Sequence, residues 1–548
     1  MPLQKNQVLT LQVERLSSDG SGVAHSPEGE TVFIPGAAPG DEARVRIVKD
    51  CKRYAFGILD EVLKPSPDRI PVDCAVAGPC GGCSLRHLDY AAELRAKQEN
   101  VADAFARIGG LDVPVLPIVG SPEIDRYRNK VQFPVGTDKA GRPCIGFYAG
   151  RTHRIVPCPD CRLQPGVLNE IGNTLCAFFA EKGIHPYNEE TGKGLVRHIF
   201  LRRGAHSGQI MVCLVSTRAK LPSAEELCTR LKEAFPDIVT ILLNVNAKNT
   251  NVILGSETHT LYGQGYIEDT LCGVPVQLGP LSFYQVNTLA AEQLYGIAAE
   301  YAQLTPDDLL LDLYCGMGTI GLSMADHCRE LVGVEIVPEA IESAKANAAR
   351  MGAAVSAKSR FFCADAGQAA AQLAAEALHP DVVMLDPPRK GCDGATLSAV
   401  VRMAPRRVVY VSCNPATAAR DAAWLEQNGY HAEKVQPVDL FPRTKHVEAV
   451  LLLTKLNVER HIEVDVSMDE LDVTAAESKA TYNEIRDYVW KHHQLKVSNL
   501  YIAQVKQKYS IIERENYNKA KNENAKQPKC PKEKEDAIVE ALKHFQMI

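Results

Sequence analysis

The 548-residue chain is 45% hydrophobic and 23% charged, which is typical of globular proteins, and it is long enough for about three or four domains. These values exclude a collagen-like or largely disordered protein. The sequence has no apolar run of about 18 residues and no signal-peptide pattern at its start, so we expect a cytoplasmic protein that contacts no membrane and keeps its 17 cysteines mostly reduced. The formal net charge of −6 predicts no general attraction to nucleic acid, so any such binding depends on local basic surfaces.

The first part of the chain has the pattern of a small β-barrel. Between residues 7 and 62, apolar and polar side chains alternate in short runs, which glycine-rich turns separate at 19–22 and 35–40. This spacing predicts about five strands, the architecture of oligonucleotide-binding folds, although a purely structural barrel has the same pattern. We assign this domain to residues 1–64, because the prolines at 65 and 67 mark a linker.

Three cysteines follow within ten residues: Cys74, Cys80 and Cys83. A second pair, Cys158 and Cys161, comes much later in the chain. Two glycines between Cys80 and Cys83 would let the backbone fold around an ion. The pattern favours a metal or iron–sulfur site, to which one of the later pair would give the fourth ligand, with zinc held by four thiolates as the alternative.

Two basic segments offset the acidic total. Between residues 126 and 162 positive charge outweighs negative charge, and residues 193–203 contain no acidic side chain. Guanidinium groups bind phosphates and aromatic rings stack on unpaired bases, as recognition of single-stranded RNA requires, although a solvated charged face has the same pattern. The residues are Arg126, Tyr127, Arg128, Lys130, Phe133, Arg142, Phe147, Tyr148, Arg151, Arg154 and Arg162, then Lys193, Arg197, His198, Arg202 and Arg203.

A different pattern begins after residue 280. Residues 309–313 read as a buried strand that runs into Gly316-x-Gly318-x-x-Gly321, a loop that suits either a dinucleotide or a methyl donor. A second strand, 331–334, ends in Glu335, a carboxylate placed to accept both hydroxyls of a ribose. Asp365 follows the probable third strand, where it could meet an adenine.

The fourth and fifth strands end in residues with possible chemical roles. Asp386 follows the fourth strand and begins an Asp-Pro-Pro loop, which is unlike those of dinucleotide dehydrogenases. Residues 408–412 form the fifth strand, which presents Cys413 at the carboxyl edge of the sheet, where ligands bind in open α/β folds. A partly exposed thiol there can act as a nucleophile, whereas a lone cysteine is more often a small apolar strand residue. Glu448 directly precedes a last hydrophobic strand.

Four motifs in this order, with Cys-x5-Cys-x2-Cys upstream, closely resemble the iron–sulfur branch of the S-adenosylmethionine-dependent RNA uracil-5-methyltransferases. That branch modifies large-subunit ribosomal RNA. The motifs are Asp312–Thr319, Asp386–Gly391, Ser412–Pro415 and His446–Glu448. The resemblance covers roughly residues 5–455, and its specificity lies in the joint occurrence of the motifs.

The resemblance implies an α/β protein of three domains. Residues 1–64 would form a TRAM barrel, 65–280 a central α+β RNA-binding domain with a four-iron cluster, and 281–456 a Rossmann-like class I methyltransferase domain. The implied cluster ligands are Cys74, Cys80, Cys83 and Cys161, and Cys158 departs from the family pattern. The implied contacts of S-adenosylmethionine are Gln285, Tyr314, Glu335 and Asp386, with Asp365 near the adenine.

The resemblance also implies the reaction, which follows from the chemistry of uracil. The Cys413 thiolate would add to C6 of a uridine in 23S ribosomal RNA, C5 would take the methyl group, and Glu448 would remove the C5 proton before the thiolate leaves. The target base must be flipped out, because a duplex hides C6. We expect a monomer with a structural cluster. The alternatives are the same chemistry on the transfer RNA T-loop, a non-catalytic RNA-binding or assembly factor, and a dehydrogenase.

Residues 457–548 extend beyond the usual family plan. After an acidic link at 463–477, residues 481–490 and 497–508 have helical spacing around a short turn, with Ser498 as a candidate N-cap. The pair resembles a helix-turn-helix, and a last helix at 532–545 follows a loop at 526–531. Docking to nucleic acid and packing against a partner are both compatible with this helical extension.

Overall fold

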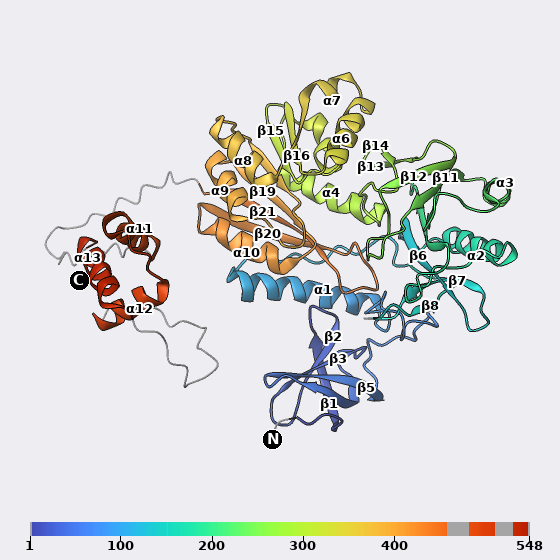
Figure 1. Cartoon of the computed structure of the whole chain (residues 1–548), viewed down its shortest axis with the longest axis horizontal. Helices are drawn as coiled ribbons and strands as arrows, with labels where there is room; N and C mark the ends of the chain where they lie inside the picture. The colour runs from blue at the N-terminus through green and yellow to red at the C-terminus, as the bar shows by residue number, and fades with distance from the viewer. Residues whose placement is uncertain (1–2, 151, 457–481, 510–529, 546–548) are drawn as a thin grey trace. The chain divides into compact units, whose positions relative to one another are not determined.

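The computed structural model describes residues 3–150, 152–456, 482–509 and 530–545. The chain divides into two compact units, residues 1–457 and 458–548. The larger unit contains a closed barrel and two seven-stranded sheets (Figure 1). The α/β class predicted from the sequence is therefore confirmed. Within the described ranges, no helix is both long enough and apolar enough to cross a membrane.

Five N-terminal strands close into the predicted barrel, in the order β1-β2-β3-β5-β4. Every second side chain in the first part of β4 is buried, so that Ala43, Val45 and Ile47 fill the interior. A Cβ atom added to Gly57 would lie 2.3 Å from a methyl carbon of Val45, and this close approach requires glycine. The strands are β1 (Val8–Leu16), β2 (Ser21–His25), β3 (Thr31–Pro35), β4 (Glu42–Asp50) and β5 (Tyr54–Lys64).

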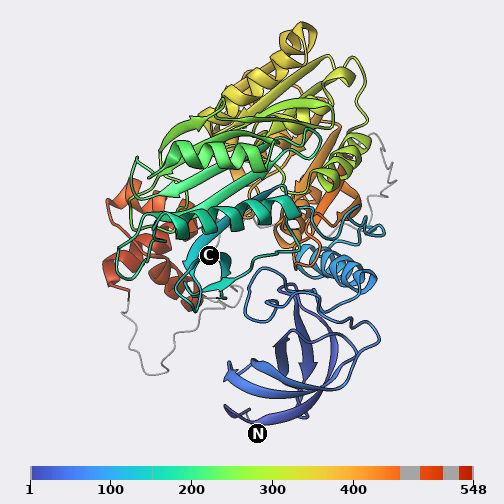
Figure 2. The ribbon, with the colours of Figure 1, turned by 90° about the vertical axis from the view of Figure 1, so that its right-hand side faces the viewer.

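The central sheet has the order β12-β11-β10-β9-β6-β7-β8. Helices α2 (Gly166–Glu181) and α3 (Ala224–Ala234) lie side by side across one face, as Figure 2 shows, and pack on Phe133 and Leu201. The opposite face, with Phe200, packs against the C-terminal domain. The strands are β6 (Lys130–Thr137), β7 (Pro143–Tyr148), β8 (Ile155–Pro157), β9 (Val196–Arg203), β10 (Ile210–Ser216), β11 (Ile238–Val245) and β12 (Glu257–Tyr262).

The C-terminal sheet has the order β17-β16-β15-β18-β19-β21-β20, in which β21 runs antiparallel to both of its neighbours. All residues of β15 and β18 are buried, as expected for parallel strands covered on both faces. The strands are β15 (Leu309–Leu313), β16 (Glu330–Glu335), β17 (Ser359–Cys363), β18 (Val382–Leu385), β19 (Arg407–Ser412), β20 (Tyr430–Val438) and β21 (Glu448–Lys455).

Helices cover both faces of this sheet, and a hairpin of two short strands precedes it (Figure 1). The hairpin strands are β13 (Ile267–Leu271) and β14 (Val274–Leu278). The helices are α4 (Thr288–Ala302), α5 (Thr319–Ser323), the 3₁₀ turn η2 (Ala325–His327), α6 (Pro338–Arg350), α7 (Ala353–Lys358), α8 (Ala366–Ala375), α9 (Gly394–Met403) and α10 (Pro415–Glu426).

Helix α1 (Tyr90–Ala104) precedes the strands of the central sheet in sequence but packs on the C-terminal domain. It continues into the π-helical turn η1 (Phe105–Gly109) and contacts α10 and β20. Val101 and Phe105 are buried in the core of the C-terminal domain. The chain then follows β20, and the backbone of Val435 both donates to Pro114 and accepts from Leu116. The residue ranges proposed for the three domains stay a prediction.

The smaller unit contains three described helices, α11 (Tyr482–His493), α12 (Asn499–Lys508) and α13 (Lys532–His544). Each helix contributes a fully buried isoleucine to a shared apolar core, namely Ile485, Ile502 and Ile538. The Ser498 hydroxyl accepts a hydrogen bond from the backbone N–H of Tyr501, as the predicted N-cap requires. The expected acidic link at 463–477 and most of the loop at 526–531 lie outside the described residues.

Candidate active site

The carboxyl edge of the C-terminal sheet brings predicted site residues together. Tyr314, Asp386 and Cys413 directly follow β15, β18 and β19, which are neighbouring parallel strands. In open α/β sheets this edge is where ligands bind. Asn414 then ends the strand, because its side chain accepts a hydrogen bond from the backbone N–H of Ala416 and caps α10.

Cys413 and Glu448 lie beside each other on neighbouring antiparallel strands. Ser412 pairs with Ala449 across β19 and β21, so the next position on each strand, outward toward the edge, is Cys413 on one and Glu448 on the other. Glu448 is buried, whereas Cys413 is half-buried. A thiol that can reach a substrate therefore lies next to a carboxyl group shielded from water.

Burial dominates the electrostatics of this pair. It raises the pKa of Glu448 well above the usual value for a carboxyl group, and the neighbouring charge of Asp386 raises it further. Burial also raises the pKa of Asp386, to about 7. The pKa of the Cys413 thiol is raised by burial and by the charges of Glu448 and Asp386, while Arg389 lowers it. The free site thus favours protonated groups, and a carboxylate formed here is a strong base.

Arg389 is a functional candidate that the sequence analysis did not single out. Its positive charge lies near enough to both groups to lower the pKa of the Cys413 thiol and that of Glu448. Its backbone carbonyl accepts a hydrogen bond from the Asn414 side chain at 2.9 Å, which ties the loop after β18 to the turn that carries the cysteine. The signal was present in the Asp-Pro-Pro-Arg order, but only the fold brings this arginine near the thiol.

We expect the Arg389→Met variant to transfer methyl groups about 100-fold more slowly in a single turnover. Without the guanidinium the pKa of the Cys413 thiol rises, so the reactive thiolate should form only at higher pH. The pH dependence of the single-turnover rate measures this shift, with Lys390→Met as the control for loss of a neighbouring exposed cation. An unshifted pH profile would show that Arg389 does not activate the thiol.

The predicted donor-binding residues line adjacent loops at the same edge. The Glu335 carboxylate accepts the backbone N–H of Gly316 at 3.1 Å, which fixes the glycine loop against the end of β16. Tyr314 adopts a left-handed backbone conformation, with φ of 66°, at the start of that loop. Asp365 instead caps α8 by accepting the backbone N–H groups of Gly367 and Gln368.

Two further groups complete the edge. Gln285 precedes α4. Burial raises the pKa of the nearby Tyr295 hydroxyl above its usual range, and the Asp386 carboxyl raises it further, whereas the Gln285 side chain lowers it. Asp312 is buried in β15 and accepts the backbone N–H of Gly321, and burial raises its pKa to about 8. One Asp312 carboxylate oxygen has no hydrogen-bond partner. Buried carboxyl groups around a glycine loop suit a cationic sulfonium donor with ribose hydroxyls.

A buried ion cluster holds the loop that leads into Glu448. The Lys97 ammonium on α1 lies 2.7 Å from carboxylate oxygens of both Glu93 and Asp439 and donates to the carbonyl of Phe441. Glu93 also accepts the backbone N–H of Arg443 at 2.7 Å. Because a buried charge that loses its partner is costly, these contacts fix residues 439–443.

The cysteine-bearing segment contacts the same loop. The backbone N–H groups of Ser84 and Leu85, immediately after Cys83, both donate to the carbonyl of Arg443. The Tyr127 hydroxyl donates to the carbonyl of Pro442 at 3.0 Å. The cysteine segment and the start of the central domain therefore help to set the position of Glu448.

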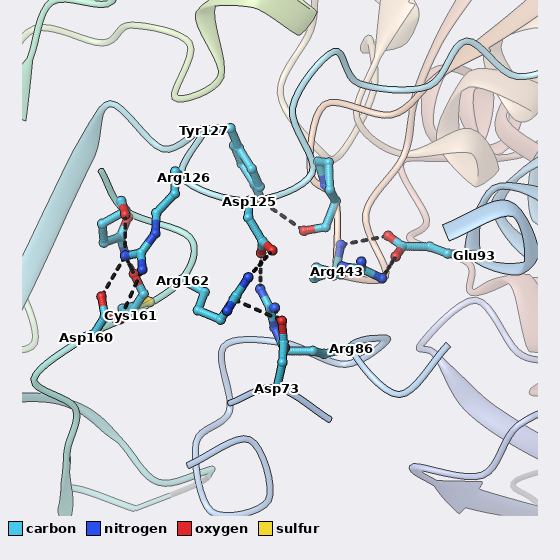
Figure 3. A network of polar contacts seen from close by, with 12 residues as sticks. Asp73, Arg86, Glu93, Asp125, Arg126, Tyr127, Asp160, Cys161, Arg162 and Arg443 are labelled. Atoms are coloured by element: carbon cyan, nitrogen blue, oxygen red, sulfur yellow. Dashed lines mark hydrogen bonds and ion pairs between the residues drawn. The ribbon is translucent and has the colours of Figure 1, made fainter. Parts of the chain in front are cut away.

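Ion pairs link the two groups of cysteines to each other. Arg86 pairs with Asp73 at 2.8 Å and with Asp125 at 2.6 Å, and Arg162 contacts the same two carboxylates (Figure 3). Arg126 pairs with Asp160 at 2.7 Å. This network joins the segment around Cys74–Cys83 to the one around Cys158–Cys161.

The four proposed cluster ligands lie within electrostatic range of one another. The pKa of Cys80 is raised by burial and by the thiols of Cys161 and Cys74, and Cys83 is affected by Cys161 and Cys80. Among the described residues, however, no three Cys, His, Asp or Glu side chains are close enough to hold a metal ion. The thiols are gathered but do not form a ready metal site, so neither the four-iron cluster nor the zinc alternative is confirmed.

Comparisons with known proteins show the family of this chain. Residues 207–456 match the family model described as tRNA (Uracil-5-)-methyltransferase, and residues 2–59 match the TRAM domain model. An uncharacterized RNA methyltransferase of Halalkalibacterium halodurans is 43% identical over 457 residues, which cover 83% of this chain and 99% of that protein. The chain belongs to the RNA uracil-5-methyltransferase family with a TRAM domain.

Other relatives support the same membership. An uncharacterized RNA methyltransferase of Oceanobacillus iheyensis is 42% identical to this methyltransferase and covers 83% of it and 98% of its own length. The solved structure of Pyrococcus abyssi tRNA (uracil-54, C5)-methyltransferase, in complex with S-adenosyl-L-homocysteine, has a TM-score of 0.65 and 27% sequence identity. It covers 82% of this chain and 100% of its own. The methyltransferase is therefore an S-adenosylmethionine-dependent RNA-modifying enzyme by family.

Proposed function

We propose that this methyltransferase transfers a methyl group from S-adenosylmethionine to C5 of a uridine in 23S ribosomal RNA through a covalent adduct on Cys413. The observation that carries the proposal is the pairing of a half-buried thiol with a buried carboxyl group across β19 and β21, with the Arg389 guanidinium beside the thiol. A non-catalytic RNA-binding factor would have no need for this arrangement.

The residues account for each proton and bond of the reaction. The half-buried Cys413 thiol loses its proton to solvent, and the thiolate adds to C6 of uracil, which moves electron density to C5 and to the O4 carbonyl oxygen. Bound S-adenosylmethionine supplies an electrophilic methyl group. As C5 forms the new bond to it, the bond between that methyl carbon and the sulfonium sulfur breaks, and S-adenosylhomocysteine is the leaving group. Glu448 then removes the proton from C5, and the bond between C6 and sulfur breaks, which restores the ring double bond and the thiolate.

Neighbouring side chains assist these steps. Arg389 favours the thiolate of Cys413, and Asp386 and its neighbours hold the base and stabilise charge that develops on its carbonyl. The raised pKa of Glu448 makes its carboxylate a stronger base than an exposed glutamate. The dehydrogenase alternative is wrong, because the family is one of methyltransferases.

Transfer RNA is the second candidate substrate. The description of the matching family model names transfer RNA, and the Pyrococcus abyssi structure is that of a transfer RNA methyltransferase. Ribosomal RNA is favoured by the resemblance of the cysteine segment to the iron–sulfur branch. A monomeric state and a cytoplasmic location remain predictions.

The substrate is tested with labelled S-adenosylmethionine and two unmodified RNAs in separate reactions, large-subunit ribosomal RNA and total transfer RNA. Mass spectrometry then locates any 5-methyluridine. Label in ribosomal RNA supports the proposal and identifies the nucleotide. If only transfer RNA is labelled, the proposed mechanism still holds but the substrate is transfer RNA. If neither RNA is labelled, the proposed activity is contradicted.

We also propose that Cys74, Cys80, Cys83 and Cys161 hold a four-iron cluster with a structural role. The support is a set of four thiols within electrostatic range of one another, beside contacts that fix the loop before Glu448. Protein purified without oxygen is expected to be brown and to contain iron and sulfide. Colourless protein that contains zinc would reject the cluster, and the Cys158→Ala variant should keep the full iron content.

A further inference from the structure

Three cations lie together on the face of the central sheet that packs against the C-terminal domain. Lys130 on β6 pairs with Arg202 on β9 in the strand register, so their side chains lie on the same face as Phe200. Arg128 precedes them in the chain and adds a third positive charge within electrostatic range of Lys130. In the part of the chain that the structure describes, no carboxylate forms an ion pair with any of the three.

This group borders the candidate active site on two sides. Asn129, between Arg128 and Lys130, donates from its side chain to the carbonyl of Gln285 at 2.7 Å. Its backbone N–H donates to Val286, so this segment is fixed directly to the donor-binding loop. On the other side, burial and then the charges of Arg389, Lys445 and Lys97 lower the pKa of His446, and Arg128 is close enough to add to this effect. His446 is two residues before Glu448.

A structural role accounts for Arg202 but not for Lys130. The buried Arg202 guanidinium donates to the carbonyls of Gly279 at 2.9 Å and Ser282 at 2.7 Å, so it fixes the loop before Gln285. Lys130 forms no such bond to a described group, and burial with the charges of Arg202 and Arg128 lowers its pKa to about 8. A half-buried ammonium group beside two guanidinium groups is destabilising unless an anion joins it.

We propose that Arg128 and Lys130, supported by Arg202, bind a phosphodiester group of the RNA beside the flipped uridine. This inference rests on the proposed function and specifies how its substrate is held. A phosphate supplies the negative charge that these three cations lack. The contact would also fix the RNA backbone next to the uridine that flips into the active site. The carboxylate of the methyl donor is the other anion that could enter, and the experiment separates the two.

The first measurement is the thermal stability of the Lys130→Met variant without RNA. Methionine has nearly the same length and removes the unpaired charge, so we expect Tm to rise by about 1 °C or more. If Lys130 instead stabilised the fold, its replacement would lower Tm. The control is Lys232→Met on α3, on the other face of the same sheet, where the ammonium lies over the Tyr262 ring and its loss should not raise Tm.

The second measurement is the affinity for a uridine-containing single-stranded RNA oligonucleotide at several salt concentrations. Loss of one phosphate contact should reduce the slope of log K against log salt by about 0.7, whereas Lys232→Met should leave the slope unchanged. The affinity for S-adenosylmethionine should equal that of the wild-type protein. Arg128→Met should reduce the slope in the same way.

Three results would overturn the assignment. If the salt slope is unchanged in both variants while the wild-type protein binds and methylates RNA, the phosphate site is rejected. The proposed function is not affected by that result. Weaker binding of S-adenosylmethionine with an unchanged slope assigns the cations to the donor carboxylate. Wild-type protein that neither binds nor methylates RNA contradicts the proposed function and the phosphate site together.

Discussion

Replacement of Glu448 by glutamine is expected to leave methylated RNA covalently attached to Cys413. The amide has nearly the same shape as the carboxyl group but cannot remove the C5 proton, so the reaction should stop after methyl transfer and before the thiolate leaves. A protein–RNA band that survives denaturing electrophoresis and carries label from the methyl donor measures this adduct. We expect the release of free product to fall at least about 1,000-fold.

The Glu448→Gln experiment has an internal control in the double variant with Cys413→Ala, which should give no adduct. The Asp308→Asn variant is a matched structural control, because it alters a buried carboxylate paired with Arg406 at the amino-terminal end of β15. That variant should lose stability without accumulating adduct. Free unmethylated RNA as the sole product of Glu448→Gln would assign the proton removal to another residue.

The second large effect is expected for Cys413→Ala. Without the thiol no bond to C6 can form, so C5 stays a poor nucleophile and turnover should fall at least about 10,000-fold. Binding of S-adenosylmethionine, measured by calorimetry, should be unchanged, because the donor-binding loops follow other strands. The control is Cys392→Ala, which removes a buried thiol from the loop after Asp386 and should keep most of the activity. Residual methylation near the wild-type rate would exclude Cys413 as the nucleophile.

Much of the fold could be predicted because its signals are local. Alternating apolar residues indicated the barrel, and short apolar runs that end in Asp386 or Cys413 indicated parallel strands with their carboxyl ends at one edge. These signals depend on strand period and chain order alone. The proximity of Cys413 to Glu448 followed from the resemblance, and the antiparallel register of β21 gives its physical reason.

Other features could not be predicted because they depend on contacts between distant segments. The packing of α1 on the C-terminal domain involves residues more than 300 positions apart, and no local pattern indicates it. Arg389 was visible in a motif, but its proximity to the thiol depends on how the loop turns. Likewise, the sequence placed Arg128, Lys130 and Arg202 in basic segments, and only the sheet register brings the latter two together.

The ion cluster around Lys97 constrains the order in which the chain can fold during synthesis. Lys97 and Glu93 emerge from the ribosome early, but Asp439 follows 342 residues after Lys97. Until then the Lys97 ammonium has only Glu93, on the same helix, as a partner. Val101 and Phe105 have no core to enter, since β20 and the residues around it are not yet made. The loop that carries Glu448 therefore takes its position only when nearly the whole larger unit has been translated, and a prematurely ended chain cannot assemble the site.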